Sequence, residues 1–174
     1  MKISKRMIIL ALLILGISIN ANAQEQKATL DFKNSAVAEK LIRTYTEALQ
    51  KGDVTTMNAQ LDEKAMIYGL GGGLDSLNIT QHKAYYTSST NEFTHSISGD
   101  LYLPVKVENN WNEGEWLLSW GTNTVTNKKT AKEIIIPYHT ASMVANGKIV
   151  FIRYYYDMLN IATSQGLTLT PAKE

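Results

Sequence analysis

The side chains in this sequence that could perform acid–base chemistry are three histidines and a large set of tyrosines. The histidines are His82, His95 and His139, and the sequence contains nine tyrosines. An imidazole titrates near neutral pH, so a histidine can act as a general acid or base when a neighbour fixes its tautomer. A tyrosine hydroxyl can donate a hydrogen bond to an oxygen that gains negative charge during a reaction. These residue types suit proton transfer, or hydrogen bonding to a bound ligand.

Several other chemistries are excluded by what the sequence lacks. No histidine stands at ligand spacing from another histidine or from a carboxylate, so we expect no metal and no cofactor. The sequence has no cysteine, which excludes thiol catalysis and disulfides. It has no G-x-S-x-G motif for a nucleophilic serine. The glycine run from Gly69 to Gly73 lacks the Lys-Ser/Thr of a phosphate-binding loop, so it predicts a turn or hairpin.

Residues 1–23 have the features of a signal peptide. Basic residues are followed by an apolar run from Met7 to Ile19, which is shorter than the roughly 20 residues that span a bilayer as a helix. Ala21-Asn22-Ala23 supplies the small-x-small pattern that signal peptidase accepts. We therefore expect cleavage before Gln24 and a periplasmic or secreted location. An uncleaved N-terminal anchor is the alternative.

The chain after the signal peptide has the size of one domain and almost no net charge. Gln24 to Glu174 is 151 residues, and without Lys2, Lys5 and Arg6 the formal charge falls from +1 to −2. This balance gives no electrostatic footprint for nucleic acid or for an anionic membrane. No later stretch is long and apolar enough to span a membrane. We therefore expect neither nucleic acid nor membrane as a partner after signal cleavage.

The first half of the mature chain has the pattern of three helices. Apolar residues recur at helical spacing from Ser35, a plausible N-cap, and Gly52 stands where a C-terminal glycine is expected. Asp53 can cap a second, shorter helix. A third helix begins at Asn78 or Thr80.

The second half of the mature chain is rich in β-branched and aromatic residues with short turns between the runs. Asn146-Gly147 is a strong type I′ hairpin signal. Helices followed by an antiparallel meander define an α+β domain. We expect a flexible segment at 24–34, the domain at 35–166 and a tail at 167–174. The expected strands are Ala65–Tyr68, Leu101–Val107, Glu115–Thr126, Ile134–Ala145 and Lys148–Met158.

This order of elements resembles the NTF2-like superfamily of the SnoaL-like type. The resemblance covers residues 35–166 and includes a first helix ending in "YTEALQKGD" and a last strand reading "NGKIVFIRYYYDM". It implies a cone, in which three N-terminal helices pack on a curved antiparallel β-sheet and enclose a pocket. It also implies a homodimer through the open sheet face, with Phe151, Arg153 and Tyr155 at the interface. The fold hosts isomerases, dehydratases, epoxide hydrolases and binding proteins, so it does not define a function.

Matching the last strand to the ketosteroid isomerase pattern implies which residues face the pocket. Strand alternation then places Ile152, Tyr154 and Tyr156 inside. The preceding strand contributes Ile135, Pro137 and His139, and the turn places Thr122, Trp120 and Leu118 opposite these three. A one-residue bulge would instead bring Ser119 and Gly121 inward. The resulting ligand-binding residues are Tyr45, Tyr86, Trp120, Ile135, Pro137, His139, Ile152, Tyr154 and Tyr156.

The resemblance argues against two of the reactions that this fold supports. Tyr45 stands where an isomerase has its oxyanion tyrosine, but Gly69 replaces the carboxylate base and His139 the second acid. Without a base, proton abstraction beside a carbonyl lacks its main participant. In the epoxide hydrolases, Tyr154 stands in place of a carboxylate, and no Arg-x-Asp occurs between Trp116 and Thr126.

A dehydratase remains possible, because "FTHSISG" resembles the histidine segment of scytalone-dehydratase-like members. His95 and His139 would then be the two histidines, and Tyr68 stands where a water-holding tyrosine is expected. The helix carboxylate that would orient a histidine is not matched, and Gln50 stands near its place. The leading hypothesis is an exported protein that binds a small, largely apolar molecule. The alternatives are a dehydratase or isomerase-type lyase using His139 with Tyr45 and Tyr68, and a homodimeric scaffold without a ligand; whether turnover occurs is left open.

Overall fold

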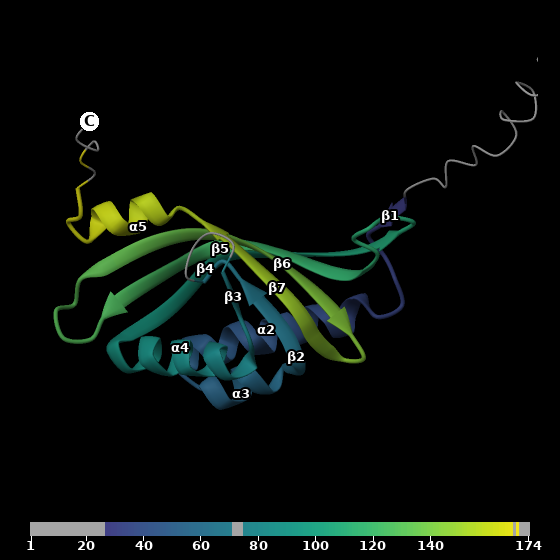
Figure 1. Cartoon of the computed structure of the whole chain (residues 1–174), viewed down its shortest axis with the longest axis horizontal. Helices are drawn as coiled ribbons and strands as arrows, with labels where there is room; N and C mark the ends of the chain where they lie inside the picture. The colour runs from purple at the N-terminus through teal and green to yellow at the C-terminus, as the bar shows by residue number, and fades with distance from the viewer. Residues whose placement is uncertain (1–26, 71–74, 169, 171–174) are drawn as a thin grey trace, which may run out of the picture.

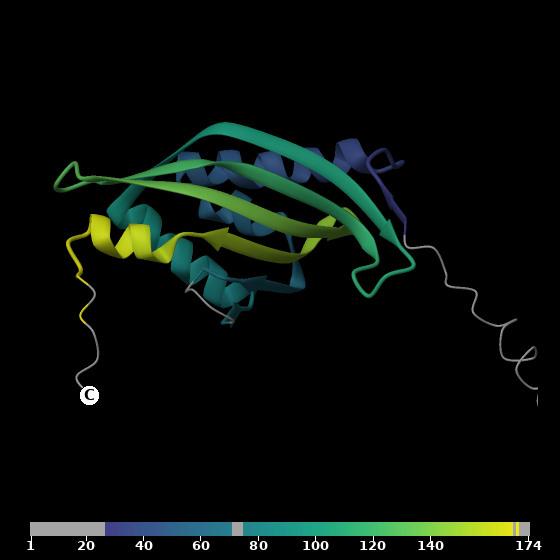
Figure 2. The ribbon, with the colours of Figure 1, turned by 90° about the horizontal axis from the view of Figure 1, so that it is seen from above.

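The computed structural model describes residues 27–70, 75–168 and 170. The predicted signal peptide, the glycines at 71–73 and part of the predicted tail lie outside these residues. The sheet has seven strands in the order β1-β4-β5-β6-β7-β2-β3. It is strongly curved and arches over α2, α3 and α4, while α5 and β1 lie at opposite ends of its long axis (Figures 1 and 2). The predicted α+β cone is confirmed.

The helices begin and end at local signals that the sequence carries. Gly52 ends α2 with a left-handed φ of 70°, and the Asp53 side chain accepts a hydrogen bond from the Thr56 amide at the start of α3. Asn78 caps α4 in a capping box. No helix in the described part of the chain is long and apolar enough to cross a membrane. The helices are α2 (Ser35–Lys51), α3 (Val54–Ala59), α4 (Ile79–Glu92) and α5 (Met158–Ser164).

The strands form an antiparallel meander with additions at both edges. β4 to β7 pair in sequence order, β1 adds antiparallel to β4, and β2 pairs parallel to β7. β1 therefore uses part of the segment predicted to be flexible, and α5 is a helix that the sequence pattern did not reveal. The strands are β1 (Lys27–Thr29), β2 (Leu61–Tyr68), β3 (Ser76–Leu77), β4 (Phe93–Glu108), β5 (Gly114–Asn127), β6 (Glu133–Ala145) and β7 (Lys148–Tyr156).

The core lies between the inner face of the sheet and the apolar face of α2. Leu41, Ile42 and Leu49 are buried on this helix. They belong to one buried cluster with strand residues such as Leu117 and Ile152. Burying each such side chain stabilises the fold by about 2 kcal/mol. This packing holds α2 against the sheet and fixes Tyr45, on the same helix face, at the site described below.

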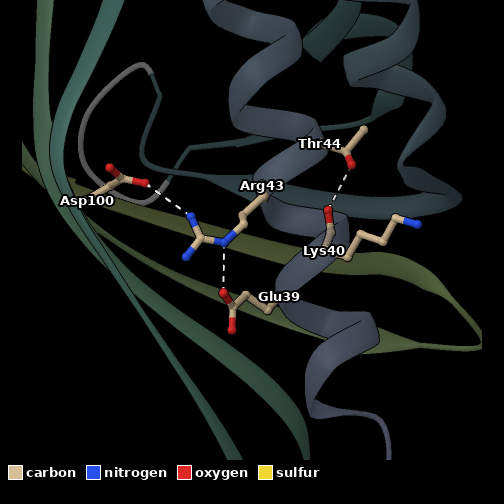
Figure 3. A network of polar contacts seen from close by, with 5 residues as sticks. All are labelled: Glu39, Lys40, Arg43, Thr44 and Asp100. Carbon is tan, nitrogen blue, oxygen red and sulfur yellow. Dashed lines mark hydrogen bonds and ion pairs between the residues drawn. The ribbon is translucent and has the colours of Figure 1, made fainter.

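A polar cluster on the exposed side of α2 links this helix to β4. The Arg43 Nε atom lies 2.8 Å from Glu39 Oε1, one helical turn away, and its Nη1 lies 3.6 Å from Asp100 Oδ2 (Figure 3). The Arg43 guanidinium also lies 4.1 Å from the ring centroid of Tyr102 on β4. Exposed ion pairs contribute little stability, so this cluster adds little to the stability of the domain.

A β-bulge in β7 decides which residues of the neighbouring strands face inward. Ile149 and Ile152 are both buried, although residues three apart in a regular strand lie on opposite faces. Ile149 pairs with Val144, but Phe151 pairs with Met143, so one extra residue is inserted in β7. Beyond the bulge every residue of β6 lies on the face opposite to that expected from an uninterrupted hairpin.

The predicted inner face of β6 and β5 is therefore wrong. Tyr156, Tyr154 and Ile152 pair with Tyr138, Thr140 and Ser142, which share their inner face. The pairing of β5 with β6 is also two residues away from the expected one, because the turn is centred one residue later. The predicted inward residues that lie on the outer face are Leu118, Trp120, Thr122, Ile135, Pro137 and His139. The alternative with a one-residue bulge, which brings Ser119 and Gly121 inward, agrees with the structure.

Candidate ligand-binding site

A cavity of about 290 Å³ lies between the inner face of the sheet and helices α2, α4 and α5. Most of its wall is apolar, with residues such as Ile42, Val125 and Ile136. None of the described residues that line it carries a formal charge at neutral pH, apart from what His95 can acquire by protonation. An apolar cavity with a few polar groups is the usual design of a site for a small, uncharged molecule.

Three tyrosines from three different elements meet at the wall of this cavity. Tyr45 comes from α2, Tyr86 from α4 and Tyr154 from β7. The hydroxyl oxygen of Tyr154 lies 2.7 Å from that of Tyr45, and the Tyr86 hydroxyl donates to Tyr154 across 3.3 Å. We call these three residues the tyrosine cluster. Burial raises the pKa of each hydroxyl well above its ordinary value, so all three are neutral phenols.

Behind the tyrosine cluster lies a fully buried histidine that does not line the cavity. His82, on α4, has its Nε2 atom 2.7 Å from the Tyr45 hydroxyl and its Nδ1 atom 2.8 Å from Asn58 Oδ1. Burial lowers the pKa of His82 to about 4, so the ring is neutral at pH 7. A neutral ring has one donor and one acceptor nitrogen, and both are used here.

A second polar group in the cavity wall is built around His95, at the start of β4. Its Nε2 lies 3.0 Å from the Ser89 hydroxyl and its Nδ1 lies 3.1 Å from Asn123 Nδ2. The pKa of His95 is lowered, chiefly by burial and against the opposing effect of the Asn123 hydrogen bond. Among the described residues, the buried Asn123 Oδ1 has no protein partner. The Asn123 amide is therefore a second group that a ligand could bind.

Three other polar side chains in the wall are satisfied within the protein. The Ser119 and Thr140 hydroxyls bond each other at 2.5 Å across β5 and β6. The Tyr156 hydroxyl donates to the Leu70 carbonyl at 2.7 Å. Tyr85 and Tyr138 also line the wall, so the polar groups within reach of a ligand lie at the tyrosine cluster, beside His95 and at these two residues.

The structure brings together only some of the residues predicted for the site. Those that line the cavity are Tyr45, Tyr86, His95, Ile152, Tyr154 and Tyr156. His139 instead stacks between Trp120 and Tyr155 on the outer face, with ring centroids 4.7 and 5.5 Å away. Tyr68 also lies on the outer face, against Phe151 and Arg153. The predicted constellation of His139 with Tyr45 and Tyr68 is therefore not formed.

Sequence reasoning missed the two polar residues behind the tyrosine cluster, the buried His82 and the half-buried Asn58. A usable signal was present, since His82 and Tyr86 stand four residues apart and so share one face of α4. They are the buried residues of this helix. The apolar pattern of α4 is weak, so its inward face is marked by these polar aromatic rings. We also find no group of three His, Asp or Glu side chains arranged as metal ligands in the part of the chain that the structure describes.

Solved structures with the same architecture identify the fold. An LEH-like epoxide hydrolase of M. tuberculosis matches with a TM-score of 0.61 and 14% identity, over 76% of this chain and 91% of that one. An NTF2-like protein from Burkholderia xenovorans matches at 0.57 and 18%, over 78% and 98%. A ketosteroid isomerase-like protein from Erwinia carotovora matches at 0.56 and 17%, over 72% and 98%. No known protein family and no curated protein matches the sequence.

These likenesses establish the class of the protein at the level of its fold. The chain has the NTF2-like cone fold that the sequence predicted. The cavity described above lies inside the cone, so its position agrees with the pocket that the family resemblance implied.

Proposed function

We propose that the protein binds a small, uncharged, largely apolar molecule in the cone, with one polar atom of the ligand held at the tyrosine cluster. The observation that carries this proposal is the meeting of three neutral tyrosine hydroxyls at the wall of a cavity of about 290 Å³. That volume is close to the lower end of ligand sites, which span roughly 300–1,000 Å³. The Asn123 amide offers a second contact to a ligand with two polar ends.

Binding is favoured over turnover by the chemistry of the cavity wall. Proton abstraction or hydration needs a base or acid in reach of the reacting atom, and none of the described lining residues is a carboxylate. His95 is the histidine in the wall; its lowered pKa disfavours the protonated, acid form, and both of its ring nitrogens are already engaged by Ser89 and Asn123. Two of the similar structures are named for an epoxide hydrolase and a ketosteroid isomerase-like protein, but the carboxylates expected for those reactions are missing here.

A pair of tryptophan substitutions tests the cavity as the binding site. Ile136 lines the cavity, whereas its neighbour Ile135 is 58% exposed on the opposite face of β6. We expect Ile136→Trp to fill the cavity and to weaken binding of 2-naphthol, a neutral bicyclic phenol, by at least about tenfold. Ile135→Trp is the matched control and should bind 2-naphthol as the wild type does in calorimetric titration. Equal affinity for all three proteins, or no binding by the wild type, would contradict the proposal.

We also propose that the outer face of the sheet forms a homodimer interface. Trp120, His139 and Tyr155 stack in one row across β5, β6 and β7, and Trp120 and Tyr155 are exposed. Aromatic rings are enriched in protein interfaces. Sedimentation of the wild type and of Tyr155→Glu at micromolar concentration tests this. A wild-type dimer that Tyr155→Glu dissociates is expected, and a wild-type monomer would remove the idea.

Finally, we propose that the protein is exported and that its mature form begins at Gln24. The support is the basic start, the short apolar run and the Ala21-Asn22-Ala23 pattern. Intact-mass measurement on protein from the native host gives the answer directly. A mass that includes residues 1–23 would contradict cleavage.

A further inference from the structure

The hydrogen bonds of the tyrosine cluster run in one direction, which is set by the buried His82 and its partner Asn58. Asn58 presents its carbonyl oxygen Oδ1, an acceptor, to His82 Nδ1 at 2.8 Å. With the Asn58 amide in this orientation, His82 Nδ1 carries the ring proton, because only a donor can bond to that oxygen. The other ring nitrogen, Nε2, is then an acceptor. Since it lies 2.7 Å from the Tyr45 hydroxyl, Tyr45 donates its proton to His82.

The same direction continues from Tyr45 to the end of the cluster. With its own proton bound to His82, the Tyr45 oxygen can only accept, so Tyr154 donates to it across 2.7 Å. The Tyr154 oxygen in turn accepts from Tyr86 across 3.3 Å. The geometry at Tyr86 thus agrees with the direction deduced at His82. All three protons point along this row of hydrogen bonds toward the buried imidazole, and Tyr86, its first donor, lines the cavity.

We propose that His82 and Asn58 are positioning residues that make the tyrosine cluster a hydrogen-bond acceptor, selective for an uncharged ligand carrying a hydroxyl or N–H group. This assignment rests on the proposed function and names the class of ligand. The ligand donates to the Tyr86 oxygen, which ends the chain. A ligand with only a carbonyl or ether oxygen finds no free proton there unless Tyr86 gives up its bond to Tyr154.

This direction also separates the cluster from an oxyanion-binding site. A tyrosine that stabilises an enolate must aim its proton at the ligand. The proton of Tyr45 is held by His82 on the side away from the cavity. Tyr45 occupies the position that the family resemblance gives to an oxyanion tyrosine. In this protein its hydroxyl instead links His82 to Tyr154.

The first test reads the proton on His82 in the intact wild-type protein. Two-dimensional NMR of ¹⁵N-labelled protein distinguishes a protonated from an unprotonated ring nitrogen. We expect Nδ1 of His82 to be protonated and Nε2 to be unprotonated at pH 7. The opposite tautomer would overturn the inference, whether or not any probe binds.

The second test compares two probes that differ in the donor alone. 2-Naphthol donates a hydrogen bond, whereas 2-methoxynaphthalene has the same rings and an oxygen that can only accept. We expect the wild type to bind 2-naphthol about tenfold more tightly. Asn58→Leu frees the tautomer of His82 and should reduce this ratio to about threefold or less. Asn34→Leu, at an exposed asparagine whose amide instead contacts Glu115, is the control and should keep the ratio.

A variant at Tyr86, the residue that ends this row of hydrogen bonds, keeps the test decisive if Asn58→Leu does not fold. Tyr86→Phe removes the oxygen that we assign to the ligand contact, so affinity for 2-naphthol should fall about tenfold while that for 2-methoxynaphthalene is unchanged. Equal wild-type affinity for the two probes would overturn the inference and leave binding in the cavity standing. Failure of both probes to bind the wild type would overturn the proposed function, and this ligand class with it.

Discussion

Gly69 and Tyr154 approach each other so closely that a β-carbon on Gly69 would overlap the backbone carbonyl oxygen of Tyr154. Gly69 follows β2 and has a left-handed φ of +85°. Tyr154 carries the central hydroxyl of the tyrosine cluster. The contact therefore brings the end of β2 against the part of β7 that supplies this hydroxyl, and it leaves no space for a side chain at position 69.

Gly69→Ala should destabilise the protein by about 3 kcal/mol, because the left-handed backbone and the overlap each add a cost. Gly147→Ala is the matched control. Gly147 has a φ of +72°, but no atom lies within 4 Å of its hypothetical β-carbon. We expect it to lose only about 1 kcal/mol. Urea denaturation measures both, and equal losses would show that the contact with Tyr154 has no energetic effect.

Tyr154→Phe should reduce both stability and 2-naphthol affinity, whereas Tyr155→Phe should change neither appreciably. Removing the Tyr154 hydroxyl leaves Tyr45 without its donor and Tyr86 without its acceptor. An unsatisfied buried polar group costs about 1–3 kcal/mol. Tyr155 is 51% exposed on the opposite face of the same strand. Denaturation and titration of the two variants should therefore differ, and a Tyr154→Phe protein that behaves as the wild type would count against the cluster.

The fold could be predicted because its elements depend on local signals. Gly52, Asp53, Asn78 and Asn146-Gly147 end or begin elements where the sequence places them. Alternation gave two possible inner faces for β7, and the family resemblance selected the one with Tyr154 and Tyr156, which line the cavity. Such signals act over a few residues and need no knowledge of the partners in space.

The sequence could not decide between the regular pairing of β5 and β6 and the bulged alternative, because one inserted residue exchanges their faces. The buried pair Ile149 and Ile152, at odd spacing, carried the sign of the bulge, yet the hairpin at Asn146-Gly147 predicts regular pairing by itself. Because of that error, His139 was predicted to face the pocket and His95 was treated as a minor candidate. His82 was missed for a different reason: its value depends on two partners, Asn58 and Tyr45, that come from other helices.

The protein should become less stable as the pH is lowered, because protonation of His82 is disfavoured in the folded state. The pKa of His82 is about 4 in the folded protein and about 6.5 in the unfolded chain. Between these values the unfolded state binds a proton that the folded state excludes, so the free energy of unfolding decreases as the pH falls. This contribution is fully present above about pH 6.5. Its loss reaches about 3 kcal/mol near pH 4.

Denaturation of the wild type between pH 7.5 and 4.5 measures this loss, and His82→Gln should show a shallower dependence. Asn34→Gln, which changes an exposed side chain and no titrating group, is the control and should retain the wild-type dependence. His95, whose pKa is also lowered, contributes in the same direction in all three proteins. A His82→Gln curve parallel to that of the wild type would contradict the assignment of a buried neutral ring.

Helix α5 contributes Met158 and Ile161 to the cavity wall, although no residue of this helix is buried. A short, exposed helix depends strongly on its cap, and the Asp157 side chain accepts a hydrogen bond from the Asn160 amide at 3.0 Å. Losing such a cap costs about 1 kcal/mol. Asp157→Ala should therefore loosen this wall of the cavity and weaken 2-naphthol binding several-fold, with little change in global stability.

Asp53→Ala provides the matched comparison, since Asp53 caps α3 in the same way, at 2.9 Å from the Thr56 amide. No residue of α3 lines the cavity. This variant should lose about 1 kcal/mol of stability and bind 2-naphthol with unchanged affinity. Stopped-flow measurement of probe release separates the two cases, because a loosened α5 should speed release in Asp157→Ala alone. If both variants released the probe at the wild-type rate, α5 would not be part of the functional wall.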